Sequence, residues 1–183
     1  MTIRSFADQR LDDLRRAFTT LPAARTWLTC ASVYAIFLVV AAPIGLVSGL
    51  LRPDMPHLAW QNGILTAVLI FIQPALLEEV LFRGLMLPRE RRSLTRRRVV
   101  LVAAAALTLY VASHPLNARL FRPEMLGVFA SPVYLVLVTL LGLACTATYF
   151  ISRSIWPPVA IHWMTVMMWL WFLGGGALLR GTR

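Results

Sequence analysis

Three ionisable side chains, Glu78, Glu79 and Arg83, stand within one apolar stretch of the sequence. In a helix, Glu79 and Arg83 are four residues apart on one face, in the favourable acid-first order, whereas Glu78 points about 140° away from Arg83. The spacing therefore predicts a Glu79–Arg83 ion pair and a Glu78 carboxylate without a cationic partner. Such a carboxylate in a low-dielectric cavity suits a general base that activates water. The structural alternative is a salt-bridged packing contact or a charged helix end at the membrane interface.

Two of the three histidines, His114 and His162, also fall in apolar stretches. Imidazole can share a proton with an activated water or donate to a developing oxyanion, and amide hydrolysis needs both. Either histidine alone is equally well explained by a hydrogen bond to a backbone carbonyl of a neighbouring helix. The third histidine, His57, lies beside Pro56 and Asp54 and is expected to be solvated.

These residues belong to a chain with the composition of a membrane protein. Its 183 residues are 58% hydrophobic and 14% charged, with a mean hydropathy of +0.70, which excludes an ordinary soluble domain and a disordered chain. The net charge of +10 is the balance of 18 arginines against eight acidic residues. The arginines cluster between apolar stretches without interleaved aromatic side chains. We therefore interpret the arginines as a topology signal of a protein in a lipid bilayer, and expect no nucleic-acid partner.

Five apolar stretches are candidates for crossing the bilayer, because a helix rises ~1.5 Å per residue across a core of ~30 Å. They cover residues 27–51, 61–87, 99–114, 128–151 and 155–173. The third is short unless it begins at Ser93, which could cap it. A re-entrant piece around residues 120–129 would add a sixth element. The predicted fold is an all-α polytopic membrane bundle of about five to six transmembrane helices.

The first 25 residues carry apolar side chains at helical spacing, including Leu11, Leu14 and Phe18, among arginines and aspartates. This pattern predicts an amphipathic interfacial helix. Residues 26–179 are then a single intramembrane helical domain, and residues 180–183 a tail. With the N-terminus in the cytoplasm, twelve arginines fall inside and five outside, so the positive-inside rule favours that orientation, in a bacterial inner membrane.

Three motifs in this sequence resemble those of one family. Glu78-Glu79-Val80-Leu81-Phe82-Arg83 resembles the EExxxR motif of the CAAX-protease and bacteriocin-processing (CPBP) family of intramembrane glutamic endopeptidases, which includes the type II CAAX prenyl endopeptidase. Tyr110 to His114 resembles the second motif, FxxxH, with tyrosine in place of phenylalanine. His162 to Val166 resembles the third, HxxxN. The resemblance implies an all-helical membrane core that hydrolyses a peptide bond without a metal or cofactor.

The resemblance also implies a role for each matching residue. Glu78 is the base, Glu79 and Arg83 are its supporting pair, His114 orients or activates the water, and His162 stabilises the oxyanion. Val166 departs from the motif, because it cannot donate the hydrogen bond that the asparagine supplies. Losing one such donor slows turnover by roughly 10²- to 10³-fold.

Val166 stands where the third motif has asparagine, and the missing hydrogen-bond donor has three explanations. Thr165, on a neighbouring face, supplies a hydroxyl; another donor enters; or hydrolysis is lost. The third explanation describes a weak or silent family member that acts as a membrane interaction or immunity protein.

A zinc enzyme using both histidines and a glutamate is a further alternative, although the sequence holds no HExxH motif. Transport is weaker still, because no repeat halves are visible. The substrate is expected to be a peptide or the tail of another membrane protein.

Overall fold

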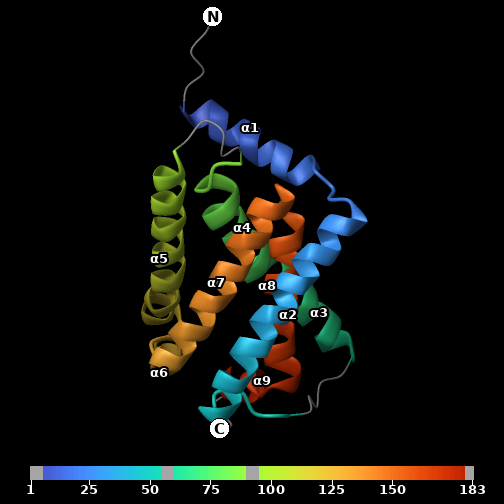
Figure 1. Cartoon of the computed structure of the whole chain (residues 1–183). Coiled ribbons are helices and arrows are strands. Elements are labelled where there is room, and N and C mark those ends of the chain that lie inside the picture. Colours follow the sequence, from blue (N-terminus) through green and yellow to red (C-terminus); the bar gives the residue numbers. More distant parts are fainter. Residues whose placement is uncertain (1–5, 55–59, 90–94, 180–183) are drawn as a thin grey trace, which may run out of the picture.

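The computed structural model describes residues 6–54, 60–89 and 95–179, and all regular structure in these ranges is helical. The α-helices are α1 (Phe6–Thr19), α2 (Ala24–Val47), α3 (Trp60–Ile70), α4 (Leu77–Glu79), α5 (Arg96–Phe121), α6 (Leu126–Phe129), α7 (Pro132–Ser152), α8 (Trp156–Phe172) and α9 (Gly175–Leu179). The π-helical segments η1 (Phe71–Leu76) and η2 (Val80–Leu85) flank α4, and a 3₁₀ turn, η4 (Pro123–Met125), precedes α6. The predicted all-α bundle is confirmed (Figure 1).

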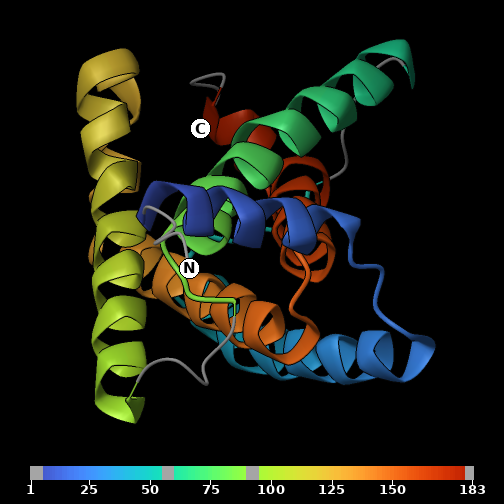
Figure 2. The same cartoon turned by 90° about the horizontal axis from the view of Figure 1, so that it is seen from above.

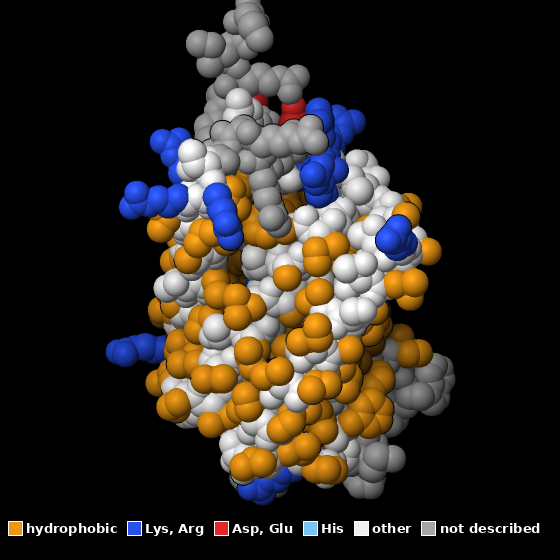
Figure 3. Space-filling model, in the orientation of Figure 1, with side chains coloured by type: hydrophobic (Ala, Val, Ile, Leu, Met, Phe, Trp, Pro, Cys, Tyr) orange, Lys and Arg blue, Asp and Glu red, His pale blue; other side chains and the backbone are white. Residues whose placement is uncertain are grey.

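Within these described ranges, four stretches of helix are long and apolar enough to cross a membrane: Ala24–Val47, Gly63–Leu85, Arg96–Phe121 and Pro132–Ser152. The fifth predicted span is present as α8, but its 17 residues reach only ~26 Å. Large apolar side chains on the outside are left uncovered, and Val47 is 91% exposed. Figure 3 shows hydrophobic side chains over most of one face, with most of its arginines at the α1 end. The chain is an integral membrane protein.

Helix α5 is longer than the sequence predicted. It begins after Thr95, whose hydroxyl accepts a hydrogen bond from the Arg98 amide at 3.4 Å. The predicted span ended at His114, but Pro115 is accommodated inside the helix, which continues to Phe121. Transmembrane helices tolerate such prolines because neighbouring groups satisfy the freed carbonyl.

Two other predictions concern the segment that follows α5 and the side chains of Ser93 and His57. The suggested re-entrant piece around residues 120–129 is a turn built from η4 and the four-residue α6, and it adds no further crossing. Ser93 and His57, for which a cap and a solvated side chain were predicted, lie outside the described residues.

The second span is interrupted where it approaches the ionisable residues. Gln73 has φ −136° and ψ 118°, an extended conformation inside an otherwise helical stretch, and Pro74 follows it without a backbone N–H to donate. Helix kinks in proteins arise at such prolines and at π-helical segments, and both are present here. The kink lies inside η1, so it divides the span into a part that ends at Ile72 and a part that begins at Pro74 and carries Glu78, Glu79 and Arg83.

Helix α7 packs against α2, α5 and α8 and forms the centre of the bundle. Gly142 lets α5 approach α7 closely, because a Cβ atom there would lie 2.6 Å from Leu107 Cδ1 and 3.0 Å from the Tyr110 ring. A larger residue at this position would separate the two helices. This close contact fixes the position of Tyr110 along α7, and with it the position of His114 one turn later on α5.

Helix α1 lies across one end of the bundle, above the segment that carries the glutamates (Figures 1 and 2). Trp156 Nε1 donates to the Phe18 carbonyl at 2.8 Å, and Ser154 Oγ donates to the Thr20 carbonyl at 2.7 Å. On its other face, Leu11 is 60% exposed. The helix predicted for this segment is therefore present, with one face docked on the bundle and Leu11 exposed on the other.

A second glycine brings α1 and the glutamate segment together. A Cβ atom at Gly84 in η2 would lie 2.5 Å from Leu14 Cδ1 of α1. Arg10 Nη1 reinforces the contact by donating to the Leu87 carbonyl at 3.2 Å. The position of the glutamate segment is therefore coupled to the docking of α1.

Candidate active site

A partly open cavity of about 550 Å³ lies between the kinked second span, α5, α7 and α8. Glu78 of α4, His114 of α5 and His162 of α8 all line it. These three residues, predicted to be catalytic, are 36 to 84 positions apart in the sequence, and the structure places them around one space. Clefts between helices of a bundle are common places for ligand sites.

The predicted ion pair between Glu79 and Arg83 is present. Arg83 Nη1 lies 3.0 Å from Glu79 Oε1, and the two side chains are 1% and 0% exposed. Arg83 Nη2 donates to the Gly142 carbonyl at 3.0 Å, and the guanidinium carbon lies 4.4 Å from the centre of the Tyr110 ring. The planar guanidinium therefore ties the glutamate segment to α7 and α5, a combination of contacts that lysine could not reproduce.

Glu79 has a second partner that the sequence did not predict. His162 Nδ1 lies 2.8 Å from Glu79 Oε1, and His162 is 2% exposed. Because a carboxylate only accepts, Nδ1 carries the proton of this bond. A carboxylate that fixes the tautomer and orientation of a catalytic histidine in this way is familiar from hydrolase triads.

The orientation of His162 leaves its second ring nitrogen directed toward Glu78. His162 Nε2 lies 4.0 Å from Glu78 Oε2, too far for a direct hydrogen bond. An oxygen atom hydrogen-bonded to both would lie about 2.8 Å from each. Glu78 Oε2 is itself buried, so the two groups lie close together without a direct bond.

Glu78 keeps its carboxylate toward the cavity. Its side chain is 20% exposed, and within the described part of the chain Oε2 has no hydrogen-bond partner. Arg83, the nearest cation in the sequence, gives its hydrogen bonds to Glu79 and Gly142 instead. Glu78 is neither directed at lipid nor hydrogen-bonded to the guanidinium.

His114 is held from behind by its own helix. Its Nδ1 lies 2.9 Å from the Tyr110 carbonyl, one turn earlier, and its ring meets the Tyr110 ring edge-on at 5.0 Å between centroids. Because a carbonyl only accepts, Nδ1 donates and Nε2 carries the lone pair. In the neutral ring, Nε2 can accept a hydrogen from a water in the cavity.

The structure places Thr165 away from this cavity. Its hydroxyl donates to the Ile161 carbonyl at 2.8 Å and lies 3.3 Å from the Tyr34 hydroxyl, in a different pocket. Val166 does line the cavity, but it has no polar side-chain atom. The structure therefore gives no support to Thr165 as the missing donor, because one residue along a helix is a turn of about 100°, which carries the hydroxyl away from the cavity.

Other polar side chains line the cavity without having been predicted from the sequence. They are Gln73, Asn117, Arg122, Tyr134 and Trp169. The Nε1 atom of Trp169 is buried and has no hydrogen-bond partner among the described residues. Nothing in the spacing of these residues distinguishes them from interfacial or packing residues, so only the fold identifies them.

A three-ligand metal site was an alternative suggested by the two histidines. In residues 6–54, 60–89 and 95–179, no group of three or more His, Cys, Asp or Glu side chains is arranged to hold a metal ion. The contacts of His162 and His114 go instead to a carboxylate and a backbone carbonyl.

The geometry can be compared with known proteins. No curated protein and no solved structure matches the chain. A family model described as type II CAAX prenyl endopeptidase Rce1-like matches residues 60–168, which include the kinked second span, α5, α7 and most of α8. This match covers more than half of the chain and includes Glu78, His114 and His162 of the cavity. The chain therefore belongs to the Rce1-like family of type II CAAX prenyl endopeptidases, which are membrane proteases.

Proposed function

We propose that the protein is a glutamic-type intramembrane endopeptidase in which Glu78 activates a water molecule. One observation carries the proposal: two adjacent carboxylates have different surroundings. Glu79 is fully buried and bonded to both Arg83 and His162, whereas Glu78 faces the cavity without a bonded cation. Glu79 is thus suited to positioning and Glu78 to proton transfer.

The first step is attack of water on the carbonyl carbon of the scissile peptide bond. The water donates one hydrogen to Glu78 and the other to His114 Nε2, so that its lone pair is directed at the substrate. Glu78 takes the proton as the new C–O bond forms. It then delivers this proton to the leaving nitrogen, and the C–N bond breaks to give a carboxylic acid and an amine.

His162 is suited to stabilising the oxyanion that forms in between. To donate from Nε2 it must carry a proton on both ring nitrogens, and the Glu79 carboxylate at Nδ1 stabilises that imidazolium. In this proposal Glu79 and Arg83 act through His162 and through the position of the helix segment. Val166 leaves one oxyanion donor missing, so the expected turnover is slow.

The proposed substrate is a peptide or the tail of a membrane protein that reaches the cavity from the bilayer. The proposed location is a bacterial inner membrane with α1 on the cytoplasmic side. The arginines at the α1 end of the molecule in Figure 3 support this orientation through the positive-inside rule.

A second candidate function rests on Val166. If the missing donor has ended catalysis, the protein is a silent family member that binds membrane partners or confers immunity. The cavity, the ion pair and the fold would then serve binding alone, and the carboxylate of Glu78 would be dispensable.

The experiment compares new peptide termini in membranes of cells that carry the wild-type protein or Glu78→Gln. A protease predicts termini that are present with the wild-type protein and absent with Glu78→Gln. Glu124→Gln, the same change at an exposed residue outside the cavity, serves as the matched control and should retain them. A cellular effect that survives Glu78→Gln would establish the silent alternative, and loss of cleavage on adding a chelator would establish the zinc alternative.

A further inference from the structure

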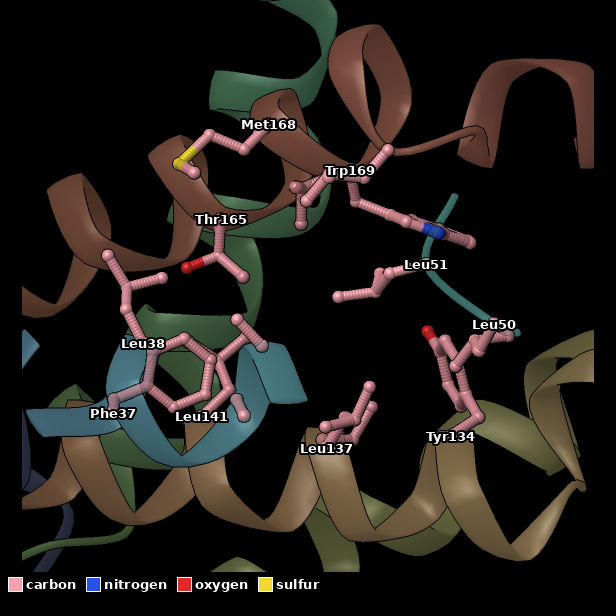
Figure 4. Close-up of a pocket in the computed structure, with 15 residues that line it drawn as sticks. Phe37, Leu38, Leu50, Leu51, Tyr134, Leu137, Leu141, Thr165, Met168 and Trp169 are labelled. Carbon is pink, nitrogen blue, oxygen red and sulfur yellow. The ribbon is translucent and has the colours of Figure 1, made fainter. Parts of the chain in front are cut away.

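A second pocket, of about 140 Å³, lies beside the catalytic cavity, and Val166 lines both spaces. Figure 4 shows this second pocket. Its walls come from α2, the turn that follows α2, α7 and α8, and they are almost entirely apolar. The lining residues include Phe37, Leu137 and Leu141. No step of the proposed mechanism uses this pocket.

The pocket and the catalytic cavity share a wall. Tyr134, Val138, Leu141, Val166 and Trp169 line both spaces. A substrate whose peptide bond lies at Glu78 would therefore have a neighbouring side chain within reach of the pocket. Val166 stands at this boundary, where the motif asparagine would have placed a polar group.

The pocket is held open by backbone contacts. The Leu51 amide donates to the Gly45 carbonyl at 2.9 Å, and the Arg52 amide donates to the Leu173 carbonyl at 3.1 Å. These bonds fix the turn after α2 to both α2 and the end of α8, with Leu50 and Leu51 at the rim (Figure 4). The opening is thus part of the folded structure and does not require a substrate to form it.

The chemistry of the lining selects an apolar occupant. The Thr165 hydroxyl already donates to the Ile161 carbonyl, so it offers little to a polar substrate group. The volume is close to that of a cavity of about 150 Å³ that holds one benzene molecule. One leucine, methionine or phenylalanine side chain fits, whereas a farnesyl chain has more than twice as many carbon atoms as benzene.

We infer that this pocket is the subsite for one large apolar side chain next to the scissile bond, so that the substrate is chosen by a residue and not by a prenyl group. The inference rests on the proposed function, because it assumes that the peptide bond lies at Glu78. A missing methylene in an apolar pocket costs 10- to 200-fold in kcat/KM, so replacing leucine by alanine should cost at least tenfold.

The test uses otherwise identical transmembrane-tail peptides with glycine, alanine, leucine or phenylalanine at each position flanking the scissile bond. Cleavage by the purified protein is followed by mass spectrometry. Ala42→Phe fills the pocket and should remove the preference for leucine at one position while glycine and alanine peptides are still cut. Ala35→Phe makes the same change on an exposed face of α2 and should leave the preference intact.

Binding of the same peptides to the Glu78→Gln variant separates the two proposals. In the first outcome, the wild-type protein cuts no peptide, but Glu78→Gln binds leucine peptides at least tenfold more tightly than glycine peptides, and Ala42→Phe abolishes that difference. The subsite then stands and the protease proposal falls. If peptides are cut without any side-chain preference, or Ala42→Phe changes nothing, the subsite is refuted and the protease proposal stands. Equal binding of all peptides without cleavage overturns both.

Discussion

The buried ion pair between Glu79 and Arg83 gives the sharpest prediction about stability. Arg83→Gln removes a guanidinium that is 1% exposed and leaves the Glu79 carboxylate, itself fully buried, without its cation. It also removes the donor to the Gly142 carbonyl at 3.0 Å. Breaking one partner of a buried pair costs about 3–5 kcal/mol of unfolding free energy.

Glu79→Gln should lower the unfolding free energy by less in the Arg83→Gln background than in the wild-type protein. The double variant has two neutral amides and no buried charge, whereas each single variant leaves one charge unpaired. We therefore expect the double variant to be more stable than the sum of the two single changes predicts, by about 2 kcal/mol or more. Part of the cost of Glu79→Gln remains, because His162 loses its carboxylate partner.

The assay is reversible unfolding of the purified protein in mixed micelles, performed on the wild-type protein, both single variants and the double variant. Glu124→Gln controls for loss of a carboxylate at an exposed site and should change stability by less than about 0.5 kcal/mol. Additive single effects, or an Arg83→Gln variant as stable as the wild-type protein, would refute the conclusion that this pair is buried and mutually dependent.

Three further predictions concern single residues. Val166→Asn should raise turnover on a cognate peptide by up to about 10²- to 10³-fold, because it restores a hydrogen-bond donor on the wall of the cavity; turnover at or below the wild-type level would contradict that role. Gly84→Ala should loosen α1 and expose it to added protease at a cost of about 1–3 kcal/mol, while Gly127→Ala, with open space around it, should not; equal protease resistance would contradict the close contact. Tyr110→Phe removes a buried hydroxyl without a partner among the described residues and should stabilise the fold by about 1 kcal/mol; a loss of more than that would reveal a partner for the hydroxyl.

The fold class and the inner ion pair could be predicted because both depend on local periodicity. Apolar runs of more than 18 residues have few other structures available to them in a bilayer. The Glu79–Arg83 contact follows from a spacing of four residues on one helix, and the structure contains it at 3.0 Å. The resemblance of the three motifs was confirmed by the family match over residues 60–168.

What could not be predicted depends on contacts between helices. The bond from His162 to Glu79 joins residues 83 positions apart, and no spacing rule reports it. The interruption at Gln73 was not foreseen either, although Pro74 marks a place where a helix can kink. The range of α5 was underestimated, because the helix continues through Pro115 to Phe121.

Straight helices of equal depth would have left His114 misaligned with Glu78 by up to ~9 Å. All three catalytic candidates nevertheless line one cavity, and the helices that carry them cross obliquely (Figure 1). The direction of the Thr165 side chain could not be predicted either, since the face of α8 that meets the cavity is set by its packing against α2 and α7.

The most direct test of the central claim is the rate of peptide-bond hydrolysis by purified Glu78→Gln beside Glu124→Gln, with both variants confirmed to unfold at the wild-type midpoint. If Glu78 activates the water, turnover should fall by at least about 10²-fold in the first variant and stay at the wild-type level in the second. Turnover within tenfold of wild type in a folded Glu78→Gln protein would show that another group activates the water.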